Sequence, residues 1–122
     1  MKKINLYINM SWNEGYTLTL YCSACNDPPG TRDIAYTKGS IKKATAGYTV
    51  AFNRAFYDKN IGERIHLDIF DEDGKIIASH QPYILDFHGK GDEIIDFYIG
   101  ERDECNCHKH IWSGKECRFK FI

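Results

Sequence analysis

The sequence lacks features that would assign it at once to several broad functional classes. No run approaches about eighteen consecutive apolar residues, so nothing in it predicts a membrane-spanning helix. Neither sign of charge dominates, because 16 lysines and arginines stand against 17 aspartates and glutamates, for a formal net charge of -1. A chain without a strong overall charge has no general attraction for nucleic acid or for an anionic membrane. We therefore expect a soluble protein whose partner is neither a nucleic acid nor a membrane.

An export signal and a full disulfide framework are lacking as well. Lys2 and Lys3 begin a short basic region, but Asn5, Asn9 and Asn13 interrupt any apolar segment behind it. The 5 cysteines are an odd number, which cannot all pair within one chain. The sequence therefore predicts a cytoplasmic protein, and clustered cysteine and histidine in a reducing compartment favour metal over disulfide.

What the sequence has in plenty is material for a core. Its 122 residues include 7 Phe, 8 Tyr and 2 Trp, and a chain of this length can bury a core without covalent staples. No repeat, low-complexity tract or linker divides it. We expect one globular domain over residues 1–122, and the sequence leaves the oligomeric state open.

Short alternating segments separated by turn residues indicate strands. Apolar residues alternate with polar ones over 3–10, over 15–22 and, most clearly, over 65–70, after which Asp73-Gly74 predicts a tight hairpin. With further segments near the C-terminus, about eight strands recur at the spacing typical of a sandwich. The predicted fold is an all-β, single-domain antiparallel β-sandwich.

The segment 41–59 fits a second interpretation. Its apolar residues recur at helical spacing, Ser40 could cap a helix and Gly62 could follow its end. However, Val50 and Phe52 also fit one face of a strand, and Gly47 is costly inside a helix. The alternative fold is therefore α+β, with one helix near 41–59 on an antiparallel sheet.

The cysteines and histidines form the most specific pattern in the chain. "YCSACND" places two thiols at C-x-x-C spacing where a strand runs into a turn, and "CNCHKHIWSGKEC" offers further thiol and imidazole ligands. Structural zinc prefers four such ligands in a tetrahedron, all from protein. The candidate metal ligands are Cys22, Cys25, Cys105, Cys107, His108, His110 and Cys117.

Two other interpretations of these residues remain. Cys22 and Cys117 each share an apolar strand face, where a free cysteine usually behaves as a small core residue. A redox pair at Cys22 and Cys25 usually opens a helix, whereas two prolines follow here. A third use, a zinc-dependent hydrolase built on the C-terminal cysteines and histidines, needs three protein ligands and an open position. No H-E-x-x-H motif supports it, and we predict no catalytic residues.

The chain contains the segments "PGTRDIAYTKGSI", "VAFNRAF" and "IHLDIFDEDGK". These three segments resemble the C2 domain family. The resemblance implies an eight-stranded sandwich and a calcium-dependent lipid-binding module. It also implies that Asp27 or Asp33, together with Asp71 and Asp73, would hold calcium. The sequence "DEDG" at 71–74 is equally explained by a tight hairpin turn.

The remaining candidates are aromatic. Trp12, Tyr57, Tyr98 and Trp112 would be contact residues if they lie on the surface, because aromatic side chains often anchor protein interfaces. The function that best fits the whole sequence is a small, non-catalytic binding or inhibitor protein stapled by a structural zinc. It would dock on a partner protein or sequester a small ligand, as phage or mobile-element (viral) inhibitors do.

Overall fold

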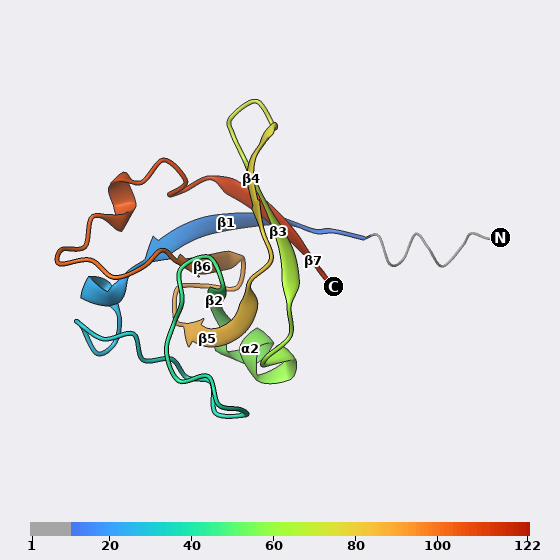
Figure 1. Cartoon of the computed structure of the whole chain (residues 1–122). Helices are drawn as coiled ribbons and strands as arrows, with labels where there is room; N and C mark the ends of the chain where they lie inside the picture. The colour runs from blue at the N-terminus through green and yellow to red at the C-terminus, as the bar shows by residue number, and fades with distance from the viewer. Residues whose placement is uncertain (1–10) are drawn as a thin grey trace.

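The computed structural model describes residues 11–122 and consists mainly of one β-sheet (Figure 1). Its strands are β1 (Asn13–Tyr21), β2 (Thr49–Asn53), β3 (Ile65–Phe70), β4 (Ile76–His80), β5 (Tyr83–His88), β6 (Ile94–Tyr98) and β7 (Glu116–Phe121). One α-helix, α2 (Arg54–Asn60), and two short 3-10 turns, η1 (Ser23–Cys25) and η2 (Cys107–Lys109), complete the described elements. No helix in this part of the chain has the length and apolar character needed to cross a bilayer.

The strands run in the order β4-β3-β7-β1-β6-β2-β5. β1 pairs with β6 and β2 pairs with β5 in parallel, while the other neighbours are antiparallel. The prediction of a purely antiparallel sheet is therefore wrong. Parallel neighbours need a long connection between them. The paired positions of β1 and β6, such as Thr17 and Ile94, are 77 residues apart in the sequence, too far for a local sequence pattern to reveal.

The sheet curls around its core. β4 and β5 stand at opposite ends of the strand order, yet only Gln81 and Pro82 connect them. Backbone hydrogen bonds from Ile65 N–H to the Pro82 carbonyl (3.0 Å) and from Ile84 N–H to the Glu63 carbonyl (2.9 Å) join the start of β5 to the start of β3. The prediction of a β-rich domain is confirmed in this form. A two-sheet sandwich is not confirmed, because the seven described strands belong to one hydrogen-bonded sheet.

Buried apolar residues from every strand except β4 fill the concave side, and the half-buried Ala78 of β4 packs against them. In β3 the alternation predicted from the sequence is confirmed, since Ile65, Leu67 and Ile69 are fully buried. Phe119 of β7 lies at the centre of an aromatic group, with its ring centroid 5.1 Å from that of Phe52. Each buried side chain of this size contributes about 1.5–3 kcal/mol through the apolar surface removed from water.

The segment 41–59 contains both predicted structures, one after the other. β2 occupies Thr49–Asn53, and α2 begins immediately behind it at Arg54. The Asn53 side chain caps the helix by accepting the Phe56 N–H at 3.0 Å. Gly47 has a φ of 81°, a left-handed conformation that a helix interior does not allow. A helix over all of 41–59 is therefore wrong, and the helix covers residues 54–60 only.

The hairpin predicted at Asp73-Gly74 is confirmed. β3 and β4 pair antiparallel across it, and the Asp71 carboxylate accepts the backbone N–H groups of Asp73 (2.8 Å) and Lys75 (2.9 Å). Gly74 adopts a φ of 81°. The alternating segment predicted at 3–10 lies outside the described residues.

Candidate metal centre

Four cysteines from two distant segments meet at one end of the sheet. The Sγ atoms of Cys22, Cys25, Cys105 and Cys107 all lie within 4.8 Å of one another. The Sγ–Sγ distance is 3.6 Å between Cys22 and Cys25 and 3.8 Å between Cys25 and Cys107. All four thiols are free. Tetrahedral zinc with bonds of about 2.3 Å places its sulfur ligands about 3.8 Å apart, so these separations suit one ion.

The first pair is positioned by the end of β1. The strand ends at Tyr21, and the chain turns through η1, where Cys25 N–H donates to the Cys22 carbonyl at 3.2 Å. Cys22 N–H in turn donates to Cys25 Sγ at 3.3 Å. Ser23 holds this turn against the segment that follows β6, because its N–H donates to the Gly100 carbonyl at 3.1 Å. The C-x-x-C spacing thus closes a turn that directs both thiols to one point.

The second pair follows β6. Ile99 N–H donates to the Tyr21 carbonyl at 2.9 Å, which carries the parallel pairing of β1 and β6 past the ends of both strands. The loop behind it leads to η2, where His110 N–H donates to the Cys107 carbonyl at 3.1 Å. Figure 1 shows η1 and this loop at the same end of the sheet. Cys107 is buried and Cys105 is exposed, so the group lies at the surface with one side covered.

Burial and mutual contact shift the pKa values of these thiols. Burial raises the pKa of Cys25 to about 11. Burial, followed by the hydrogen bond with Cys22, raises the pKa of Cys107 further. The hydrogen bond from Cys25 lowers the pKa of the exposed Cys105. Without a metal, Cys25 and Cys107 stay protonated at neutral pH, and a bound ion would have to displace those protons.

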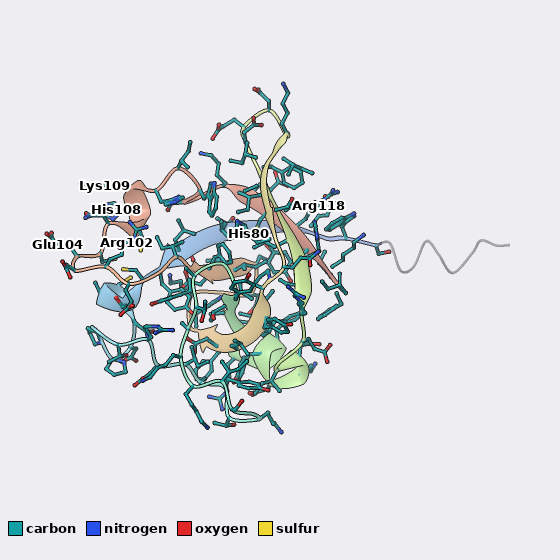
Figure 2. All side chains as sticks on the ribbon, viewed as in Figure 1. His80, Arg102, Glu104, His108, Lys109 and Arg118 are labelled. Atoms are coloured by element: carbon teal, nitrogen blue, oxygen red, sulfur yellow. The ribbon has the colours of Figure 1, made fainter. Side chains whose placement is uncertain are left out.

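Three of the predicted ligands lie outside this group. His108, labelled with Lys109 on η2 in Figure 2, lines the pocket beside the cysteines but is not one of the grouped ligands. His110 Nδ1 accepts the Trp112 N–H at 3.0 Å, and its ring packs on Trp112. Cys117 is fully buried on the core face of β7, where burial raises its pKa to about 12. The two histidines therefore lie outside the four-cysteine group, and Cys117 is a core residue.

The calcium ligands implied by the C2 resemblance are not brought together. Among residues 11–122, the four cysteines are the only group of three or more Cys, His, Asp or Glu side chains placed to share an ion. The Asp71 carboxylate is occupied by the hairpin backbone, and Asp33 forms an ion pair with Lys43.

The four predicted aromatic contact residues differ in exposure. Tyr57 and Tyr98 are 4% and 1% exposed, so they belong to the interior and offer no surface for a partner. Trp112 is half-buried and packs edge-on against His80, with centroids 5.3 Å apart. Trp12 is also half-buried, and the Arg118 guanidinium lies 3.8 Å from its ring centroid.

A polar pocket beside the cysteines was not predicted from the sequence. Its volume is about 580 Å³, and Asp86, Asp96, Tyr21 and Lys90 line it together with Cys25. A signal was present, because "YILDFH" and "IIDFY" each place one aspartate within an otherwise apolar strand. A carboxylate in such a position is buried only where partners satisfy it.

Comparison with known proteins adds nothing to this geometry. No protein-family model matches the sequence, and a search of curated proteins finds no match.

Proposed function

We propose that Cys22, Cys25, Cys105 and Cys107 hold one structural zinc ion, and that the domain which this ion stabilises is a non-catalytic binding protein. The observation that carries the proposal is the convergence of four thiols, none of them in a disulfide, within 4.8 Å. Soft thiolate ligands in a compact tetrahedral set select zinc over the hard cations, which prefer oxygen.

Four protein ligands argue for a structural rather than a catalytic ion. A hydrolytic zinc keeps one position open for water, whereas four cysteines fill a tetrahedron. His108 and His110, which a hydrolase would use as further ligands or as a base, lie outside the group. The zinc would connect the turn after β1 to the loop after β6 and fix one end of the sheet.

Binding is the activity left for such a domain, and the convex face of β3 and β7 supports it. There the Arg118 guanidinium lies between the rings of Trp12 and Phe70, 3.8 Å and 5.3 Å from their centroids. Its Nε donates to the buried Asp68 carboxylate at 3.0 Å. Tryptophan and arginine are enriched among the residues that dominate protein interfaces, and a fixed arginine loses little side-chain entropy on binding.

Elemental analysis combined with native mass spectrometry tests the metal. We expect one zinc per chain in protein purified under reducing conditions, and loss of that zinc in Cys25→Ser and Cys107→Ser. The matched controls are Cys117→Ala and the double variant His108→Ala/His110→Ala, which should keep it. Wild-type protein that stays free of zinc after expression and purification with added zinc would overturn the proposal, as would zinc lost only from the histidine variant.

A further inference from the structure

The polar pocket lies on the face of the sheet opposite the main core, next to the four cysteines. Thr19 and Tyr21 of β1 and Asp96 of β6 form its floor, and the turn that follows β5 forms one side. Cys25 and Cys107 contribute to its wall. With a volume of about 580 Å³, it falls in the size range of small-ligand sites.

Two carboxylates define its chemistry, one from the buried Asp96 and one from the half-buried Asp86. Asp96 is 5% exposed, and its Oδ1 accepts the Thr19 hydroxyl at 2.8 Å. Asp86 accepts the backbone N–H groups of Ala35 (3.2 Å) and Phe87 (3.0 Å) through Oδ1. Its Oδ2 accepts the Tyr21 hydroxyl at 3.3 Å. Burial, together with the charge of Asp96, raises the pKa of Asp86, and a cation bound beside it would favour its charged form.

One ammonium group lies beside these carboxylates. Among the described residues lining the pocket there are three aspartates, with Asp27 at the rim, and a single lysine or arginine, Lys90. The Lys90 ammonium lies 3.0 Å from Asp96 Oδ2 and 3.4 Å from the Thr19 hydroxyl. Its side chain is 45% exposed and reaches in from the turn after β5, whereas the Asp96 side chain is only 7% exposed. A buried carboxylate is costly to leave without a partner, so Lys90 leaves most readily where another cation takes its place.

We propose that this pocket binds a primary alkylammonium group, and that Lys90 occupies the place of that group in the free protein. Asp96 is the principal contact and Thr19 the second acceptor, as they are for Lys90. Tyr21 also lines the pocket, with its hydroxyl on Asp86, and an aromatic ring beside the site adds attraction for an ammonium ligand. The proposal extends the proposed function, because it names the chemistry of the partner that a binding protein of this kind would take.

The ammonium can come from two sources, a lysine side chain on a partner protein or a free amine. Isothermal titration at low ionic strength distinguishes them, with N-acetyl-lysine methylamide as the side-chain probe and 1,5-diaminopentane as the free amine. The control ligand is the same lysine amide acetylated on its side chain, which keeps the stem and removes the charge.

Three variants give the expected pattern for whichever probe binds. Asp96→Asn should weaken binding at least about tenfold, the loss expected for a charge-assisted hydrogen bond. Lys90→Gln removes the internal competitor and should tighten binding at least about fivefold, because the ligand no longer has to displace the partner of a buried carboxylate. Asp73→Asn makes the same charge change at the tip of the β3–β4 hairpin and should leave binding unchanged.

The outcomes separate this inference from the metal proposal, because zinc content is measured on the same samples. Zinc-loaded Lys90→Gln protein that binds neither amine overturns the pocket and leaves the zinc standing. Zinc-free protein that binds an amine with the expected response to Asp96→Asn overturns the zinc and supports the pocket. Equal binding of the side-chain-acetylated control, or equal losses in Asp96→Asn and Asp73→Asn, refutes recognition of an ammonium by Asp96.

Discussion

Replacing either Cys107 or Cys117 by alanine separates metal binding from packing. The two cysteines are 5% and 0% exposed, so each substitution removes one sulfur atom from packed surroundings at a cost of about 1 kcal/mol. Only Cys107 belongs to the four-cysteine group. With free zinc about a thousandfold above its Kd, binding contributes about 4 kcal/mol to the free energy of unfolding.

We therefore expect Cys107→Ala to lose about 5 kcal/mol and Cys117→Ala about 1 kcal/mol when zinc is present. For a domain of this size, 1 kcal/mol corresponds to a change in Tm of roughly 3 to 5 °C. A chelator should lower the Tm of the wild type and of Cys117→Ala by roughly 12 to 20 °C and leave Cys107→Ala almost unchanged.

The assay is thermal unfolding followed by circular dichroism in reducing buffer, with zinc or with chelator. Equal losses of unfolding free energy in the two variants, together with a wild-type Tm that the chelator does not change, would refute the reasoning. The four thiols would then be core and surface cysteines that happen to meet. Retention of the native spectrum at low temperature in each variant shows that the comparison starts from folded protein.

Three further predictions concern the fold. Burial alone would raise the pKa of Asp68, but hydrogen bonds from Ser79, Arg118 and His66 outweigh it and lower that pKa. Asp68→Asn should therefore cost about 2 kcal/mol near neutral pH. The difference in unfolding free energy between the wild type and Asp68→Asn should shrink as the pH falls below about 3.8 and through the lower pKa of the folded state. Urea unfolding measures it, and a difference that persists at pH 2 would contradict this prediction. Gly74→Ala should cost about 1 kcal/mol because of its φ of 81°, whereas Gly89→Ala, with a free Cβ position and no positive φ, should be nearly neutral in the same assay. Phe119→Ala should cost about 3–5 kcal/mol and Phe121→Ala, which is 43% exposed, about 1 kcal/mol or less; similar losses would show that the core is centred elsewhere.

Local elements could be predicted from segments whose residues fit only one kind of secondary structure. The alternation over 65–70 and the turn at Asp73-Gly74 are both present as expected, because side-chain period and turn chemistry are properties of neighbouring residues. The segment 41–59 carried two patterns because it contains two elements. Its strand residues, such as Val50 and Phe52, and the turn of helix behind them share one apolar side.

The cysteine group could be predicted only in part, since its two halves are held by different means. Cys22 and Cys25 lie in one local turn, which the C-x-x-C spacing predicts. The identity of the second pair depends on the loop after β6, which returns to β1 through a parallel pairing that no local pattern encodes. The sequence also offered Cys117 as a candidate ligand, and the structure places it in the core as part of β7.

The pocket shows the same limit more strongly. Asp86 and Asp96 lie on different strands, β5 and β6, which are not neighbours in the sheet because β2 separates them. Their common pocket arises from the strand order, and the strand order follows from long-range pairing.

The position of β1 between β6 and β7 also bears on how the protein is made. Thr17 of β1 pairs with Ile94 on one side and with Glu116 on the other. During synthesis, β1 leaves the ribosome early and keeps both backbone edges unpaired until those two strands follow, whereas the β3–β4 hairpin closes as soon as it emerges. Pairings between distant segments are slow to form and leave strand edges exposed meanwhile. The first cysteine pair likewise meets the second only after β6 has formed, so an ion held by all four thiols would bind in the same late interval in which the sheet closes.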